Sequence, residues 1–215
     1  MKIQIKCVMA LTIALISIPV FAETIELRYK DFYSHVRKLS GEDTQALQFA
    51  FGFQHVSEAR LCELTSAEIV TQKQRLPLAI SAENRFTIQS ERALNLADAT
   101  VVLETSDSVE QCDMSVQLET KPEYLKQYYT SEELRFIFEQ YAAFFNEMGS
   151  FLSFMMPQVD GLMLHFDDPE LDHDIRDAPS IVNGMLQLRS DYWQGNKTLV
   201  LPEVPLRITA RTDES

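Results

Sequence analysis

Hydrophobic and polar residues alternate along most of this chain, with the period of two that is typical of β-strands with one buried face. The clearest run covers residues 111–120, and its apolar face carries Cys112, Met114, Val116 and Leu118. Similar short runs are separated by polar turns, which predicts antiparallel strands in a sandwich or sheet layer. The predicted strands lie in residues 24–30, 45–56, 61–71, 75–80, 84–88, 97–105, 111–120, 161–166, 184–189, 197–201 and 204–211.

A long stretch at residues 130–157 follows the helical repeat instead. Thr130 and Glu133 have the spacing of a capping box, and Pro157 ends the pattern. The polar stripe is narrow and the apolar arc is wide, which predicts a helix buried against a sheet and its neighbours. The alternative is a contact surface for a partner, an apolar ligand or a second copy of the chain. Its candidate residues are Tyr141, Phe144, Phe145 and Phe151.

A short helix is predicted near the N-terminus, with Asp31 as its N-cap and Leu39 as its last residue. Phe32 and Val36 share its apolar side with Leu39. The pattern as a whole predicts an α+β fold, in which a mainly antiparallel β body carries one long buried helix and this short one. One domain is expected over residues 23–215, with a candidate division near 121–130 into a β-rich part and a part made of the helix and later strands.

Residues 1–22 have the pattern of a cleaved signal peptide. A basic start precedes an apolar run of about fourteen residues, which is too short to span a bilayer of about 30 Å. Val20 and Ala22 place branched and small residues where a signal peptidase reads them. An uncleaved anchor is the alternative. Because Glu23 rather than cysteine follows the cut, we expect no lipid attachment but a periplasmic protein that does not span the membrane.

The chain is strongly acidic, with a formal net charge of −13. Residues 1–22 hold Lys2 and Lys6 and no acid, so the mature net charge becomes −15. A protein with this excess of negative charge lacks the positive surface that binds the phosphate backbone of nucleic acid. We therefore expect no nucleic-acid partner.

Cys62 and Cys112 remain after signal cleavage, an even count in an oxidising compartment. A disulfide between them is predicted, and it would stabilise the fold by about 4 kcal/mol in the chain-entropy model. A metal or redox role for the pair is the alternative. No C-x-x-C motif supports that alternative.

Four segments resemble an uncharacterised family of secreted gammaproteobacterial proteins, known as a domain of unknown function with the number 2987. The segments are LRYKDFYSHVRKL, LCELTSAEIVTQKQRLPL, LNLADATVVLET and QCDMSVQLETKP. The resemblance covers Leu27 to Pro122, and its two cysteine-bearing strands are the most specific part. It implies export and the cysteine pair, and it assigns no activity and no catalytic residue.

The segment HFDDPELDHDIRD, residues 165–177, concentrates most of the candidate chemistry. Its weak candidates for metal ligands are His165, Asp167, Asp172, His173 and Asp174. A calcium loop would need a sharp glycine turn, which is missing here, and Pro169 favours a solvated turn. We expect a solvated acidic loop and no metal or other cofactor, with weak calcium binding and zinc binding as alternatives. His165 is out of phase with Leu162 and Leu164, so it is expected on the opposite strand face.

No G-x-S-x-G, H-E-x-x-H or glycine-rich phosphate motif is present in the sequence. The sequence therefore favours a non-enzymatic exported protein that binds or scaffolds an unknown envelope partner, which includes a second copy of itself. One alternative is a carrier of an apolar ligand in a pocket under the long helix. Another is a hydrolase or metal-dependent enzyme that uses the acidic residues 165–177.

Overall fold

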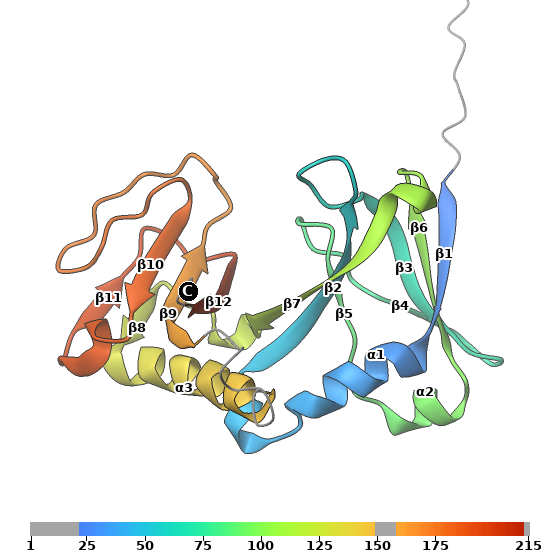
Figure 1. Ribbon diagram of the computed structural model, residues 1–215, viewed down its shortest axis with the longest axis horizontal. Helices are drawn as coiled ribbons and strands as arrows, with labels where there is room; N and C mark the ends of the chain where they lie inside the picture. Colours follow the sequence, from blue (N-terminus) through green and yellow to red (C-terminus); the bar gives the residue numbers. More distant parts are fainter. Residues whose placement is uncertain (1–21, 149–157, 213–215) are drawn as a thin grey trace, which may run out of the picture.

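The computed structural model describes residues 22–148 and 158–212, and Figure 1 shows their arrangement. The fold is α+β, as predicted, and every strand pair in these ranges is antiparallel. The strands are β1 Glu23–Arg28, β2 Leu47–His55, β3 Leu64–Val70, β4 Arg75–Pro77, β5 Phe86–Thr87, β6 Thr100–Thr105, β7 Cys112–Thr120, β8 Tyr128–Thr130, β9 Val159–His165, β10 Met185–Arg189, β11 Thr198–Val200 and β12 Arg207–Thr212. The helices are α1 Tyr29–Val36, α2 Arg92–Leu96 and α3 Ser131–Met148, and short 3₁₀ turns lie at Arg37–Leu39, Glu42–Thr44, Val109–Gln111, Pro122–Tyr124 and Tyr192–Gln194.

The N-terminal half, residues 22–120, contains two sheets with the strand orders β1-β6-β3-β4 and β5-β2-β7. Helix α1 packs against them because its apolar side presents Phe32 to aromatic rings of the second sheet. The Phe32 ring lies 4.9 Å from that of Phe51 and 5.9 Å from that of Phe86, measured between centroids. These aromatic side chains form the centre of the core in this half.

The C-terminal half, residues 121–148 and 158–212, contains the sheet β10-β9-β12 and the pair β11-β8. Helix α3 lies along this half in Figure 1. One face of the three-stranded sheet is largely buried, because its strands alternate apolar and polar residues. The buried residues of that face are Leu162, Leu164, Leu186, Leu188 and Ile208.

The two halves meet where β7 approaches β12 and where α3 reaches the N-terminal half. Gln140 on α3 accepts a hydrogen bond from the Ala46 backbone N–H (3.0 Å) and donates one to the Glu42 carbonyl (3.3 Å). The rings of Phe144 and Phe49 lie 5.8 Å apart across the same junction. One connected set of buried apolar residues therefore runs through both halves.

The predicted capping box of the long helix is confirmed. Thr130 Oγ1 accepts from the Glu133 backbone N–H (3.2 Å), and the Glu133 carboxylate accepts from the Thr130 backbone N–H (2.9 Å). The helix is described to Met148, and the rest of the predicted stretch to Pro157 lies outside the described residues. None of the helices in the described ranges combines the length and apolarity that crossing a bilayer demands.

Two local expectations need correction. Helix α1 begins at Tyr29, so Asp31 lies in its first turn and pairs with Arg28 (3.1 Å) instead of capping the helix. On β7 the predicted burial of the apolar face is wrong for Met114 and Val116, which remain 47% and 44% exposed, whereas Ser115, Gln117 and Glu119 on the opposite face are partly buried. The reason is that β7 is an edge strand of its sheet, where the aromatic residues of β2 fill the interior instead.

Candidate functional site

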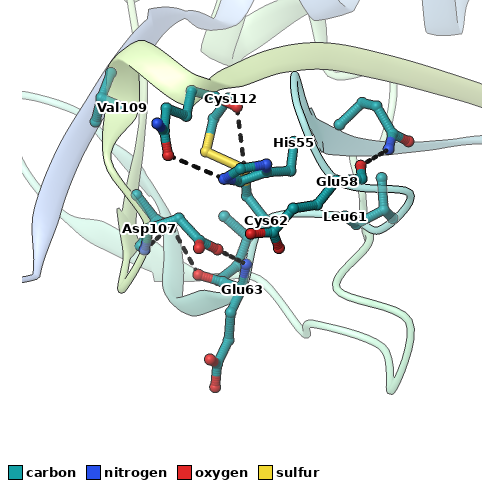
Figure 2. Close-up of a disulfide and its surroundings, with 12 residues drawn as sticks. His55, Glu58, Leu61, Cys62, Glu63, Asp107, Val109 and Cys112 are labelled. Atoms are coloured by element: carbon teal, nitrogen blue, oxygen red, sulfur yellow. Dashed lines mark hydrogen bonds between the residues drawn. A yellow bond between two sulfur atoms is a disulfide. The ribbon is translucent and has the colours of Figure 1, made fainter.

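Cys62 and Cys112 form the predicted disulfide. It ties the segment just before β3 to the first residue of β7, across a sequence separation of 50 residues (Figure 2). Cys62 is fully buried, so the bond belongs to the core of the N-terminal half. It holds the surrounding loops at one end of the sheets in a defined position.

His55 lies beside the disulfide and is buried at the end of β2 (Figure 2). Its Nε2 lies 3.0 Å from Oε1 of Gln111, and its Nδ1 lies 3.4 Å from the hydroxyl of Ser57. Both contacts are satisfied when Nε2 carries the proton and Nδ1 accepts. The imidazole is therefore a hydrogen-bonded part of the core that orders the loop next to the disulfide.

An open groove of about 730 Å³ lies next to this loop. Its walls come from three segments that are far apart in the sequence. The lining residues are Arg60, Leu61, Glu63, Ala82, Glu83, Asn84 and Asp107.

One end of the groove is organised by a fork between Arg60 and Asp107. The guanidinium donates to the two carboxylate oxygens at 2.9 and 2.6 Å, and it also pairs with Glu58 at 2.5 Å. Asp107 additionally accepts the backbone N–H of Glu63 at 2.7 Å. Arg60 first, and then this backbone N–H, lower the pKa of Asp107 to about 2. The carboxylate is therefore ionised throughout the neutral and mildly acidic range.

The opposite wall of the groove is a tight loop at residues 81–85. Asn84 adopts a left-handed backbone conformation (φ 55°), and its side-chain oxygen accepts the backbone N–H of Leu64 at 3.2 Å. This bond anchors the loop close to the disulfide. Glu83 forms an ion pair with Arg207 of β12, so the same loop also contacts the C-terminal half.

Sequence reasoning missed the groove, although one signal for part of it was available. Arg60 and Asp107 lie two and five residues before the paired cysteines. Once the disulfide is predicted, these two opposite charges are expected to come close together. The 81–85 loop has no such signal, because nothing local in its sequence reports where it packs.

The acidic segment forms an ordered hairpin extension between β9 and β10. His173 and Ile181 exchange backbone hydrogen bonds across it, at 3.1 and 2.8 Å. Its carboxylates stabilise turns by accepting hydrogen bonds from nearby N–H and O–H groups, as short acidic side chains commonly do. The bonds are Glu170 N–H to Asp168 (2.9 Å), Asn183 N–H to Asp172 (2.8 Å) and Ser180 hydroxyl to Asp174 (2.6 Å).

The structure separates the two histidines that were weak metal candidates. His165 lies on β9, where Nε2 is 3.0 Å from Oγ1 of Thr209, on the face opposite Leu162 and Leu164. His173 lies in the hairpin, and Asp167 is exposed between them. In the part of the chain that the structure describes, no three His, Cys, Asp or Glu side chains come together as a metal site.

The candidate contact residues of the long helix are distributed between core and surface. Tyr141 is 0% exposed and Phe144 is 8% exposed, so both belong to the core. Phe145 is half-buried, and Phe151 lies outside the described residues. This placement agrees with the interpretation of α3 as a buried helix.

A second groove, of about 490 Å³, lies beside the first turns of α3. Its apolar part includes Tyr124 and Phe136, whose ring centroids are 5.8 Å apart. Lys126 and Glu133 pair at its rim (2.7 Å). The full lining is Tyr124, Lys126, Tyr129, Thr130, Glu132, Glu133, Phe136 and Ile137.

These features define a disulfide-linked α+β protein with an open, charged groove beside the disulfide. The chain belongs to the family described as Protein of unknown function (DUF2987), whose model matches residues 21–166. The match continues beyond Pro122, where the resemblance recognised in the sequence ended, and takes in α3 and β9. No curated protein and no solved structure matches the chain.

Proposed function

We propose that this protein is an exported, non-enzymatic protein of the bacterial cell envelope, located in the periplasm, that binds or scaffolds a partner through the groove beside the disulfide. The groove carries this proposal. It is open, it has both charged and apolar lining residues, and it lies on loops that a disulfide and an ion-pair fork hold in place. Binding loops on a rigid scaffold lose little conformational entropy when a partner docks.

The export part of the proposal rests on two features that fit each other. The first 22 residues have the pattern of a cleaved signal peptide. The cysteine pair is bonded, and disulfides persist in oxidising compartments such as the periplasm. N-terminal sequencing of protein from the periplasmic fraction is expected to begin at Glu23. An intact mass that includes Met1 to Ala22 would contradict this part of the proposal.

The non-enzymatic part is supported by the hydrogen bonds of histidine and carboxylate side chains that could otherwise act as acids or bases. His55 makes two side-chain hydrogen bonds within the core of the N-terminal half. The carboxylates of Asp168, Asp172 and Asp174 accept bonds from their own turns. Groups bound in this way have a structural role that explains their positions without a reaction.

Site-specific photo-crosslinking tests the binding site. A photoreactive residue at Ala82, in the groove wall, is expected to give a defined adduct with one envelope protein in intact cells. The matched control is the same residue at Leu96, which is exposed on α2 and does not line the groove. A specific adduct at Ala82, reduced by Asp107→Ala, supports the proposal. Equal adducts at both positions, or none at Ala82, would contradict it.

The groove beside α3 supports a second candidate function, a carrier of an apolar ligand. Its aromatic residues and its size suit a small apolar molecule. Native mass spectrometry of protein purified from its source is expected to show a bound mass that Phe136→Glu removes. Tyr128→Glu is the control, since Tyr128 is exposed and lies outside this groove. Wild-type protein without any bound mass would leave the partner-binding function as the better one.

A further inference from the structure

The ion pair between Glu83 and Arg207 connects the groove to the C-terminal half of the chain. It joins the 81–85 loop, one wall of the groove, to β12 in the other half of the chain. Among the ion pairs found in residues 22–148 and 158–212, it is the one that links the two halves. The Arg207 side chain is 19% exposed and that of Glu83 is 31% exposed, so solvent screens the pair only in part.

His165 is the second side chain that holds Arg207. Arg207 and His165 are directly paired across β12 and β9, and a guanidinium N–H donates to Nδ1 of His165 at 3.3 Å. Nε2 of the same ring contacts the hydroxyl of Thr209. An imidazole that accepts at Nδ1 must be neutral with its proton on Nε2. The buried Nε of Arg207 has no hydrogen-bond acceptor, so Glu83 and His165 provide the side-chain bonds of this guanidinium.

The charges around His165 come from a small number of elements. On β12, Arg207 is in direct contact with the ring, and Glu83 from the 81–85 loop pairs with that arginine. On β10 the paired residue is Met185, which is uncharged. Asp167, two residues further along the chain, is exposed. A protonated His165 would therefore have the positively charged guanidinium of Arg207 as its nearest charged group.

We propose that Glu83, Arg207 and His165 form a pH-dependent clamp, which holds the 81–85 loop against the C-terminal half while His165 is neutral and releases the loop when His165 is protonated. Protonation of Nδ1 turns an acceptor into a donor that faces the donating guanidinium. It also places two positive charges in contact, and like charges in a half-buried site repel strongly. Arg207 must then move away from His165, which disturbs its pairing with Glu83.

Burial lowers the pKa of His165 below its ordinary value of 6.5. The clamp is therefore expected to stay closed at neutral pH and to open as the pH falls below that ordinary value. The clamp itself does not depend on what the groove binds. Its consequence for partner binding at the groove rests on the proposed function.

A spin label on the groove wall measures the release directly. The label is attached to Ala82→Cys in the oxidised mature protein, and its mobility is recorded by electron paramagnetic resonance between about pH 7.5 and about pH 5. In the otherwise wild-type chain, the rotational correlation time is expected to shorten by about two-fold or more over this range. A label at Leu96→Cys, on α2, is the control and should not change.

Two variants test the mechanism. His165→Gln offers an uncharged acceptor to Arg207 and cannot be protonated. In this variant the label at residue 82 should keep its long rotational correlation time at both pH values. Glu83→Gln removes the carboxylate, so its label should be mobile at both. The proposal is overturned if the wild-type label does not respond to pH, if His165→Gln keeps the response, or if the Leu96 label responds equally. No partner is present in these measurements, so their failure is separate from a failure of the proposed binding function.

Discussion

The hydroxyl of Tyr141 is completely buried and lies between strands of the two halves. It donates to the backbone carbonyl of Ile208 on β12 at 2.6 Å, and it lies 3.1 Å from the hydroxyl of Thr120 at the end of β7. Burial raises the pKa of this phenol far above its ordinary value, so it stays protonated and able to donate. A single side chain on α3 therefore connects the edge strands of two sheets.

Tyr141→Phe is expected to lower the free energy of unfolding by about 1–3 kcal/mol, because it leaves buried acceptors without their donor. Urea denaturation monitored by circular dichroism measures this change. Tyr128→Phe is the matched control, since Tyr128 is 59% exposed and should be nearly neutral. Equal effects of the two substitutions would show that the buried hydroxyl contributes nothing.

The lowered pKa of Asp107 predicts that the free energy of unfolding depends on pH. Its pKa is about 2 in the folded protein and 3.8 ordinarily, so the unfolded state takes up the proton more readily. The stabilisation by Asp107 is complete above the ordinary pKa and is lost as the pH falls from about 4 toward 2. Asp107→Asn should reduce stability by about 1–2 kcal/mol at neutral pH. It should also flatten the stability curve in this acidic window, as measured by urea denaturation at several pH values.

Helix α3 shows how one element divides its aromatic residues between the core and its edge. Phe144 packs against Phe49 of the N-terminal half, at 5.8 Å between ring centroids. Phe145 contacts Phe144 edge-on and is only half-buried. Adjacent helical positions point about 100° apart, so Phe145 points to the edge of the surface that Phe144 buries.

Phe144→Ala is therefore expected to cost about 3–5 kcal/mol of stability, and Phe145→Ala clearly less. Chemical denaturation of both variants provides the comparison. The opposite ranking would show that the junction at Phe49 does not hold the two halves together in solution.

The disulfide acts on β3 and β7 together, because it fixes the starts of both near the groove. The double variant Cys62→Ala/Cys112→Ala is expected to lose about 2–5 kcal/mol of stability. Alkylation of denatured but unreduced wild-type protein should label neither residue. Labelling of both thiols in freshly isolated protein would contradict the bond.

The chain is arranged in two halves, but its buried apolar residues form one connected set. Tyr141 and Phe144 on α3 belong to this set, and Phe144 extends it across the junction to Phe49. Gln140 adds hydrogen bonds at the same junction. Small structures that share one core usually unfold in a single cooperative step.

Calorimetry is therefore expected to show one thermal transition, with equal calorimetric and van't Hoff enthalpies. Circular dichroism and intrinsic fluorescence should report the same midpoint. The fluorescence comes largely from Trp193, which is buried in the C-terminal half, whereas circular dichroism averages over both. Two separate midpoints would show that the halves are independent folding units.

The sequence alone determined most of the local structure. Alternation predicted the strands, and the spacing of Thr130 and Glu133 predicted the start of α3, because such signals depend on residues that are close together in the chain. The disulfide was predictable because two cysteines leave a single pairing. The helix cap at Asp31 failed because propensity at one residue is a weak signal when Tyr29 packs into the core and starts the helix earlier.

Sheet order, the burial of each strand face and the groove were decided by long-range contacts. Met114 and Val116 alternate like core residues, but their exposure depends on β7 being an edge strand. The groove brings together residues 60–63, 82–84 and 107, and the clamp joins Glu83 to Arg207 across 124 positions. Local patterns report which face of an element is apolar, but not which other element covers it. That choice is made by the packing of the whole chain, which minimises exposed apolar surface and unpaired charge at the same time.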